Sequence, residues 1–475
     1  MNGAGTLGVG AGLDPRTRVL LEAPIAPTLL RMGLPNVLVM VAQAGAGLIE
    51  TWFVGKLGTD ALAGVALVFP VLMMMQMMSA GAMGGGIAAA IARTLGARRR
   101  DDANALAVHA IALALGFSLL FTLGMLLFGA PLYRQMGGSG ASLQAALIYS
   151  NWLFAGAVLV WLFNSLAAVV RGTGNMVLPA VVTCAGLVVL VPLSPLLIFG
   201  WGPVPAFGIA GGAMALLAYY AGGTLALALY LRSPKSLLLP SLNGVGLRWP
   251  LFRDILRVGL IASVSAMATN LTIGVATALV GTLGPAAIAG YGTASRLEYL
   301  LVPLVFGLGA PLVAMVGTCI GAAQRERALR STWIGAAIAG LLCEAVGLAA
   351  AFFPHAWLGL FGTDASMLET GTLYLQIVGP AYGFFGFGLA LYFASQGAGR
   401  LAWPLLGNVA RLVVGAGGGW LALHAGGGLP WIFAAQSAAL VLYGLINGWA
   451  VAGGAWFGRP GWPHGPARWA APARA

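Results

Sequence analysis

The stretch Val54–Gly64, VGKLGTDALAG, recurs as VGTLGPAAIAG at Val280–Gly290, with seven of the eleven positions identical. Two further pairs of segments resemble each other in the same way: TLGARRRDDA and CIGAAQRERA, at 94–103 and 319–328, and RGTGNMVLP and QGAGRLAWP, at 171–179 and 396–404. All three pairs lie 225 or 226 residues apart. A fixed spacing of this kind indicates that the chain contains two copies of one structural unit.

The composition places this duplicated unit in a membrane. Sixty per cent of the 475 residues are hydrophobic and 8% are charged, whereas a soluble domain keeps about 25% charged residues. The apolar runs are continuous over about twenty residues, which favours spanning helices over the alternating strands of a barrel. The 72 glycines follow no collagen repeat and are typical of membrane helices that pack closely together.

Apolar runs long enough to cross a bilayer core of about 30 Å predict twelve spanning helices, six in each copy. We therefore expect an all-α membrane protein with twelve transmembrane helices in two six-helix lobes. Because six is even, both copies start on the same side, and a substrate cavity is expected near the midplane, between or within the lobes. The expected spans are 32–54, 62–92, 105–130, 146–170, 178–200, 207–231, 256–281, 287–319, 332–354, 371–396, 402–424 and 429–456.

The basic residues predict how the chain is oriented. Lys and Arg concentrate in the segments that share a side with the N-terminus, as in ARRRDDA at 97–103, which is the positive-inside pattern of a membrane protein with both termini in the cytoplasm. The many glycines, the Trp-rich loops and the Arg-rich tail fit a bacterial inner membrane protein. This pattern accounts for the net charge of +12 without nucleic acid as a partner. The predicted parts are a cytoplasmic segment 1–31, a first lobe 32–231, a cytoplasmic loop 232–255, a second lobe 256–456 and a cytoplasmic tail 457–475.

The order, spacing and duplication of these motifs are similar to those of one known family. An acid near the end of the first helix is followed by WFVGKLGTDALAG at 52–64, GGGIAAAIARTLGARRRDDA at 84–103 and VVRGTGNMVLP at 169–179, and the second half repeats the style. From about Leu29 to Trp456 the chain resembles the multidrug and toxic compound extrusion (MATE) family. The resemblance implies a monomeric bundle of two lobes. It also implies export of amphipathic, often cationic compounds, driven by inward flow of protons or sodium.

The resemblance points to Glu50 as the proton-coupling residue. In the subgroup that this chain most resembles, an Asp on the first helix lies four or five residues before the Gly of the VG pair, and Glu50 lies five residues before Gly55. A charged acid at the bilayer centre costs about 3 kcal/mol, so it should face a cavity or carry a proton. The alternative is an interfacial Glu near Lys56 that reaches the outer surface.

The same resemblance supplies further expectations about the site. Asn164 lies seven residues before Arg171, where the family often has an Asn. The fifth-helix positions that often hold Asn and Asp are Leu190 and Ser194 here, and the position of the seventh-helix acid of a sodium-dependent subgroup is Thr269. Proton coupling is therefore expected, with sodium as the alternative. No cofactor is expected, and the scattered histidines and single cysteines predict no metal site.

Other polar and aromatic side chains inside the spans are candidates for the substrate cavity. Gln43 and Asn270 could line it, or they could form hydrogen bonds between helices. Trp161 and Tyr291 could offer the faces of their rings to a cationic compound, or they could belong to the aromatic belts at the membrane surfaces.

Three charged residues in the second half are secondary candidates. Arg296 and Glu298 lie two positions apart on one predicted helix, a spacing that does not bring side chains together, so they are expected to have separate partners. Glu344 is a lone acid in the ninth span. It is either a second titrating group or an acid held by structural hydrogen bonds.

Two other function classes remain open. A flippase for lipid-linked oligosaccharides, from the same wider superfamily, would place Arg or Lys in its cavity, and the spans offer only Arg296 and Arg411. A membrane-embedded transferase would need a cluster of acids, histidines or a metal motif at one membrane face, and the sequence shows none. The prediction is therefore a transporter of small molecules in contact with membrane lipid, and not an enzyme.

Overall fold

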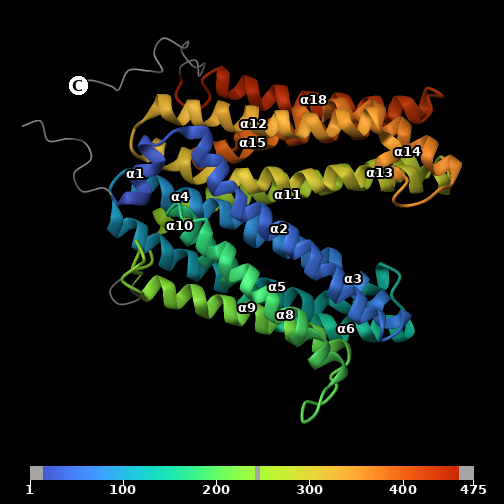
Figure 1. Ribbon diagram of the computed structural model, residues 1–475, viewed down its shortest axis with the longest axis horizontal. Helices are drawn as coiled ribbons and strands as arrows, with labels where there is room; N and C mark the ends of the chain where they lie inside the picture. Colours follow the sequence, from blue (N-terminus) through green and yellow to red (C-terminus); the bar gives the residue numbers. More distant parts are fainter. Residues whose placement is uncertain (1–13, 241–245, 459–475) are drawn as a thin grey trace, which may run out of the picture. The chain divides into compact units, whose positions relative to one another are not determined.

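The computed structural model describes residues 14–240 and 246–458 (Figure 1). Within these residues the regular structure is helical, apart from one isolated bridge between Trp201 and Val204. Parts of the predicted N-terminal segment, of the loop between the lobes and of the C-terminal tail lie outside the described residues. The chain divides into two compact units, Met1–Ala23 with Arg31–Ser263 and Pro24–Leu30 with Val264–Ala475.

The first unit contains the helices of the first repeat and the beginning of the following long helix. Most of α2 belongs to it, as does α10 up to Ser263, whereas the first turns of α2 belong to the second unit. Its elements are α1 (Pro15–Glu22), α2 (Ile25–Gly55), α3 (Thr59–Gln76), the π-helix η1 (Met77–Met83), α4 (Gly84–Gly96), α5 (Arg100–Gln135), α6 (Gly140–Ala155), α7 (Ala157–Gly172), α8 (Val177–Phe199), α9 (Ile209–Arg232) and α10 (Trp249–Gly281).

The second unit repeats this order after α10. Its helix after α10 is unbroken, whereas the corresponding α3–α4 run of the first unit contains the π-helix η1. Its elements are α11 (Pro285–Gly321), α12 (Arg325–Phe352), α13 (Pro354–Leu358), α14 (Ala365–Val378), the 3-10 turn η2 (Gly379–Ala381), α15 (Tyr382–Ala398), α16 (Ala402–Leu412), the π-helix η3 (Val413–Gly417), α17 (Gly418–His424) and α18 (Leu429–Ala452).

The expected fold class is confirmed. In the described residues, eleven helices or continuous helix runs are long and apolar enough to cross a membrane, and α6 with α7 makes a twelfth if this pair counts as one span. The pair bends by 49°, at Gly156 between the two helices. A Cβ at Gly156 would lie 2.4 Å from the Leu217 side chain of α9, so glycine lets the bent span pack closely against its neighbour.

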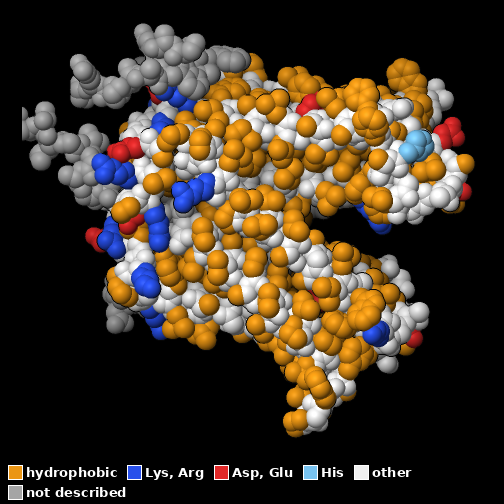
Figure 2. Space-filling view, in the orientation of Figure 1, with side chains coloured by type: hydrophobic (Ala, Val, Ile, Leu, Met, Phe, Trp, Pro, Cys, Tyr) orange, Lys and Arg blue, Asp and Glu red, His pale blue; other side chains and the backbone are white. Residues whose placement is uncertain are grey.

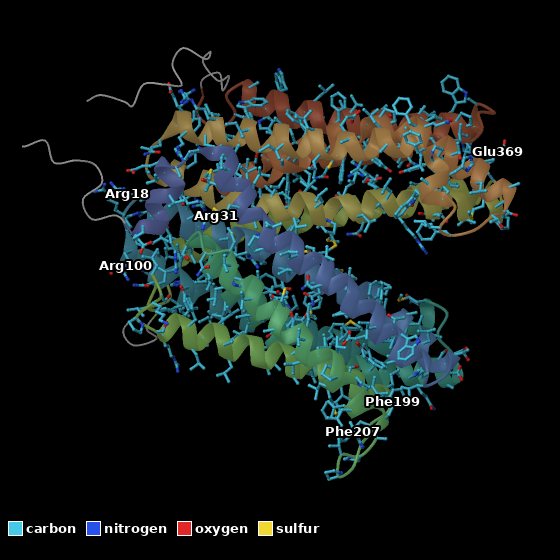
Figure 3. The ribbon with its side chains drawn as sticks, viewed as in Figure 1. Arg18, Arg31, Arg100, Phe199, Phe207 and Glu369 are labelled. Atoms are coloured by element: carbon cyan, nitrogen blue, oxygen red, sulfur yellow. The ribbon has the colours of Figure 1, made fainter. Side chains whose placement is uncertain are left out.

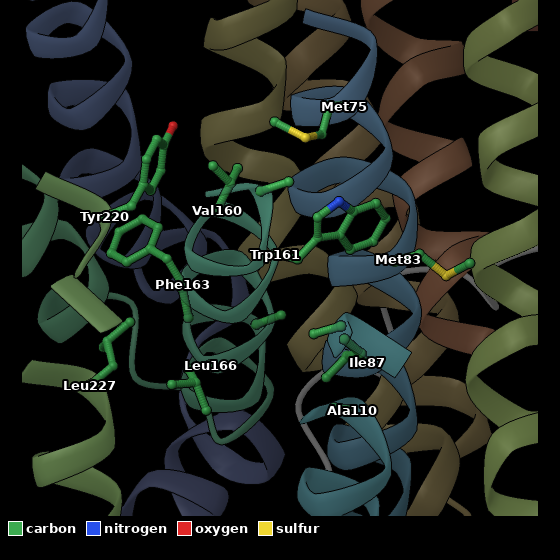
Figure 4. Close-up of a cluster of buried hydrophobic side chains, with 14 of the residues drawn as sticks. Met75, Met83, Ile87, Ala110, Val160, Trp161, Phe163, Leu166, Tyr220 and Leu227 are labelled. Carbon is green, nitrogen blue, oxygen red and sulfur yellow. The ribbon is translucent and has the colours of Figure 1, made fainter. Parts of the chain in front are cut away.

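Each unit has an apolar interior and an apolar outer surface, as a protein in lipid requires. Figure 4 shows the interior of the first unit, where Met75, Trp161 and Phe163 pack between α3, α7 and α9. On the outside, Leu127 of α5 is 68% exposed and Val188 of α8 is 73% exposed. Hydrophobic side chains cover much of the face drawn in Figure 2, and exposed apolar surface on this scale marks contact with a membrane.

Backbone packing in the second unit depends on two facing glycines. A Cβ at Gly347 of α12 would lie 2.1 Å from the carbonyl oxygen of Gly379, and a Cβ at Gly379 would lie 2.7 Å from the carbonyl oxygen of Gly347. These atoms belong to the backbone and cannot turn away. The broken span formed by α14, η2 and α15 therefore approaches α12 as closely as two backbones allow.

We expect Gly347→Ala to lower the apparent melting temperature of the detergent-solubilised protein, because overpacking of this kind costs about 1–3 kcal/mol. The matched control is Gly116→Ala on α5, where a Cβ would meet nothing within 4 Å. The control should melt at or above the wild-type temperature, since Ala favours a helix over Gly by about 1 kcal/mol. Equal melting temperatures for the two variants would contradict this account of the α12 contact.

Candidate functional site

Glu50 lies on α2 of the first unit, within electrostatic range of three tyrosines. Its side chain is half-buried and interacts electrostatically with the phenol groups of Tyr149 on α6 and of Tyr219 and Tyr220 on α9. All three tyrosines are at least 93% buried. Among the described residues no Lys or Arg forms an ion pair with Glu50. The first unit thus holds a carboxylate among phenols, without a fixed counter-charge.

A hydrogen-bond network extends from Tyr220 to Asn164 on α7. The side-chain amide of Gln76 donates a hydrogen bond to the Tyr220 hydroxyl. Asn164 Nδ2 donates to Gln76 Oε1 at 3.2 Å and to Ser79 Oγ at 2.8 Å. Gln76 is the last residue of α3 and Ser79 lies in η1, so both acceptors sit where the helix changes from α to π. π-turns of this kind occur frequently at functional sites.

Gln43 belongs to the same region. It precedes Glu50 by seven residues, or about two helical turns, so the two side chains lie on one face of α2. Gln43 and Thr183 of α8 both lie close to Tyr219. The structure therefore brings three predicted site residues, Glu50, Gln43 and Asn164, around the adjacent Tyr219 and Tyr220.

Trp161 is a core residue rather than a cavity residue. Its side chain is 1% exposed and its ring stacks on Phe117 of α5, with centroids 5.1 Å apart and planes 12° apart. Its indole nitrogen is buried and has no hydrogen-bond partner among the described residues. A substrate could not reach this ring without displacing Phe117, so the position of Trp161 gives no support to the predicted contact with substrate.

The second unit contains a buried ion pair. Arg411 Nη2 of α16 lies 2.6 Å from Glu298 Oε1 of α11, and the two side chains are 6% and 17% exposed. The Tyr374 hydroxyl donates a hydrogen bond to Glu298 Oε2 at 3.2 Å. The guanidinium of Arg411 also lies 5.1 Å from the ring centre of Phe385. This carboxylate, unlike Glu50, has a permanent cation beside it.

A small cavity of about 30 Å³ adjoins this ion pair, and Glu298 and Arg411 line it together with Tyr291, Thr272 and Gln436. It is large enough for one or two water molecules. Tyr291 is 5% exposed, and its ring stacks on Phe433 and meets Tyr374 edge-on. Of the two aromatic candidates, Tyr291 is therefore the one that lines a cavity.

The internal repeat relates the two carboxylate regions to each other. Tyr374 lies 225 positions after Tyr149, and each of these tyrosines is close to the carboxylate of its own unit. Ala276 lies 226 positions after Glu50 and lines the small cavity. The second unit thus has alanine where the first has Glu50, and it supplies a carboxylate from another helix together with an arginine.

The remaining candidates each have a separate contact. Arg296 is exposed, and its guanidinium lies 5.5 Å from the ring centre of Phe361, so it does not share a partner with Glu298. Glu344 Oε2 accepts a hydrogen bond from the Gly383 N–H at 2.7 Å, just after the helix break at η2. Asn270 is exposed and donates to the Ala266 carbonyl of its own helix at 2.9 Å.

We expect Asn164→Ala to lower the stability of the protein by about 0.6–1.7 kcal/mol, from the average to the largest value for hydrogen bonds between membrane helices. The substitution removes the donor shared by Gln76 and Ser79. Asn151→Ala is the matched control, because Asn151 is exposed on α6. Thermal unfolding in detergent should separate the two variants, and an equal loss in both would show that the network adds nothing to stability.

Comparisons with known proteins match nearly the whole described fold. The MatE family model matches residues 35–196 and 262–421, one segment in each repeat. The chain is 29% identical over 401 residues to a FAD transporter of Shewanella oneidensis, with 83% of this chain and 87% of that protein covered. It is 25% identical over 395 residues to the probable multidrug resistance protein NorM of Thermotoga maritima, with 81% and 83% covered.

Solved structures agree on the fold. The crystal structure of MATE in the bent conformation matches with a TM-score of 0.85 and 24% identity, over 92% of this chain and 96% of that chain. The crystal structure of MATE in complex with MaD3S matches with a TM-score of 0.83 and 25% identity, over 92% and 97%.

Proposed function

Because this chain belongs to the MATE family of transporters, we propose that it exports amphipathic, often cationic compounds by alternating access, in exchange for protons that enter through Glu50. The chain is a multi-pass membrane transporter of small molecules and not an enzyme. Its placement as a monomer in a bacterial inner membrane with both termini in the cytoplasm is part of the proposal.

The observation that carries the proposal is the unpaired carboxylate of the first unit. An isolated negative charge is costly in low-dielectric surroundings unless a proton or a cation neutralises it. No Lys or Arg does so in the described part of the chain. A proton and a positively charged substrate can each neutralise Glu50, but one excludes the other. This competition is the physical basis for exchanging them.

Alternating access follows if the two forms of Glu50 favour different packing of α2. Protonated Glu50 can donate a hydrogen bond to a neighbouring phenol, whereas ionised Glu50 can only accept hydrogen bonds. Tyr149, Tyr219 and Tyr220 come from α6 and α9, so the change alters how α2 is held against two other helices. Proton binding shifts the equilibrium between two states only by its difference in affinity for them.

Sodium is the less favoured coupling ion. The acid that a sodium-dependent subgroup carries on its seventh helix is replaced by Thr269, whose hydroxyl contacts the Asn408 side-chain oxygen at 3.3 Å. We therefore propose proton coupling without a cofactor.

A flavin dinucleotide is a second candidate substrate. The Shewanella oneidensis relative is named a FAD transporter, and the region beside Glu50 is aromatic: Tyr219 and Tyr220 lie 4.8 Å apart, and Phe163 and Tyr220 lie 5.5 Å apart, between ring centroids. Aromatic rings can stack on a flavin, although these three are 4–7% exposed and would have to separate to admit one. The carboxylate of Glu50 would repel its phosphates, so cationic compounds are the first choice.

The test uses purified protein in liposomes, with ethidium or FAD as substrate and with either a proton or a sodium gradient imposed. Ethidium movement that requires the proton gradient and does not respond to sodium would support the proposal. Movement driven by sodium alone would refute proton coupling. If the protein moved FAD but not ethidium, the proposed substrate would change to a flavin dinucleotide, and the proposal that the protein is an exporter would stand.

A further inference from the structure

A cavity of about 680 Å³ opens in the first unit and shares no residue with the Glu50 region. It lies between three segments: the start of α1, the turn that joins α4 to α5, and the chain that follows α9. Four basic residues line it, against one acid, Asp14. The basic residues are Arg16, Arg98, Arg100 and Lys235.

The cavity lies at the depth where spanning helices leave the bilayer. The Thr59–Gly96, Arg100–Gln135 and Ile209–Arg232 spans all end or begin beside it. Lys and Arg side chains gather at this end of the first unit in Figure 2, and Figure 3 shows Arg18 and Arg100 there. The positive-inside pattern assigns this end to the cytoplasm, so the cavity is at the level of the cytoplasmic lipid headgroups.

The contacts inside the cavity leave positive charge available for a ligand. Asp14 caps α1 by accepting a hydrogen bond from the Arg16 N–H at 2.9 Å. Arg16 Nη1 donates to the Tyr230 hydroxyl at 2.9 Å, which fixes the guanidinium in place. Arg100 and Lys235 are exposed and form no ion pair in the described part of the chain.

Two nearby acids form ion pairs with arginines that do not line the cavity. Asp102 on the first turn of α5 contacts Arg99 at 3.3 Å and Arg248 at 3.2 Å, and neither of these arginines lines the cavity. Glu22 of α1 pairs with Arg18 at 2.9 Å. The protein therefore neutralises the positive charge of the cavity only in part, and a bound anion would neutralise the rest.

The cavity also has apolar walls. Leu95, Pro234 and Leu237 line it together with the basic residues, and nearby Leu239 is 47% exposed. A free anion gains nothing from such surfaces, whereas a lipid carries acyl chains close to its phosphate. We propose that this cavity binds the phosphate-bearing headgroup of an anionic lipid from the cytoplasmic leaflet, held by Arg100 and Lys235.

A bound lipid would connect segments that are distant in sequence. Its phosphate would draw the α4–α5 turn, at Arg100, toward the segment after α9, at Lys235. The first carbons of its acyl chains would rest against Leu237 and Leu95. The phosphate would lie between the Arg100 and Lys235 cations, which repel each other when no anion separates them. We therefore expect the lipid to stabilise the first unit.

The experiment measures the melting temperature of the detergent-solubilised full chain against added dihexanoyl phosphatidylglycerol. The test variant is Arg100→Gln with Lys235→Gln. The matched control is Arg253→Gln with Arg257→Gln, which removes the same charge from exposed positions on α10, outside the cavity. Dihexanoyl phosphatidylcholine and inorganic phosphate are the two further ligand arms.

We expect phosphatidylglycerol to raise the melting temperature of the wild type and of the control, and phosphatidylcholine to have little effect. The test variant should need about thirty-fold more lipid for the same shift, given the contribution of each basic residue near an anionic surface. An unchanged response in the test variant, or an equal response to phosphatidylcholine, would overturn the proposal. If inorganic phosphate at the same concentration gave an equal shift, the cavity would bind free phosphate, and the proposal of a lipid headgroup would be wrong.

A second variant protects the test from a loss of folding. Arg100→Lys with Lys235→Arg keeps both charges and should keep the response to phosphatidylglycerol. Raising the salt concentration should weaken that response in the wild type, because exposed charges are screened within about 3 Å at 1 M. A lipid response that ignores both charge and salt would show that the headgroup is not bound by these residues.

Discussion

Glu50→Gln should abolish proton-driven export while the protein still reaches the membrane. The amide has nearly the same shape as the carboxylic acid, but it neither releases a proton nor carries a charge. We expect the rate of ethidium export under an inward proton gradient to fall at least tenfold. The measurement is efflux from liposomes with and without the proton gradient. Export by the variant should depend neither on the size nor on the direction of that gradient.

The control for this result is Glu344→Gln. It makes the same chemical change, and the side-chain oxygen of Gln can still accept the hydrogen bond from the Gly383 N–H. Export by this control should stay within about twofold of the wild type. If Glu50→Gln exported normally with an unchanged dependence on pH, Glu50 would be structural, and the coupling group would have to be sought elsewhere.

Arg411→Leu should destabilise the second unit strongly. The substitution leaves the Glu298 carboxylate buried, with the hydrogen bond from the Tyr374 hydroxyl but without its cation. Removing one partner of a buried ion pair costs about 3–5 kcal/mol. We expect a large fall in the apparent melting temperature and a smaller yield of monodisperse protein in detergent.

The double variant Arg411→Leu with Glu298→Leu tests the reason for this loss. Apolar residues that replace a buried ion pair together are often neutral or stabilising, so the double variant should recover most of the lost melting temperature. A double variant as unstable as Arg411→Leu alone would indicate that packing of the arginine against Phe385, and not the charge left on Glu298, causes the loss.

The fold could be predicted because its signals are local. Each spanning helix is a continuous apolar run, and three repeated motifs relate the two halves directly. The breaks inside the fourth and tenth spans were not predicted. The bend at Gly156 and the 3-10 turn at η2 arise where one helix packs against another, as Gly347 does against Gly379, and such contacts leave little trace in the pattern of a single helix.

The candidate site could be predicted only in part, for the same reason. Glu50 is visible as a lone acid at a family position, but its tyrosines come from helices about 100 and 170 residues later in the chain. Glu298 and Arg411 were each noticed as charges within spans. Their pairing, across 113 residues, depends on how α16 packs against α11, and a single sequence does not specify that packing.

The π-helix η1 explains an irregularity in the internal repeat. Gly64 and Thr94 lie 30 positions apart, whereas their counterparts Gly290 and Cys319 lie 29 positions apart. The extra residue falls in the run that contains η1, and the corresponding α11 has no such turn. A π-turn closes its hydrogen bonds over one more residue than an α-turn, so it absorbs the extra residue and leaves the flanking helices in register. A one-residue difference between two copies of a repeated unit is accommodated by such a turn, and Gln76 and Ser79 meet Asn164 at that point.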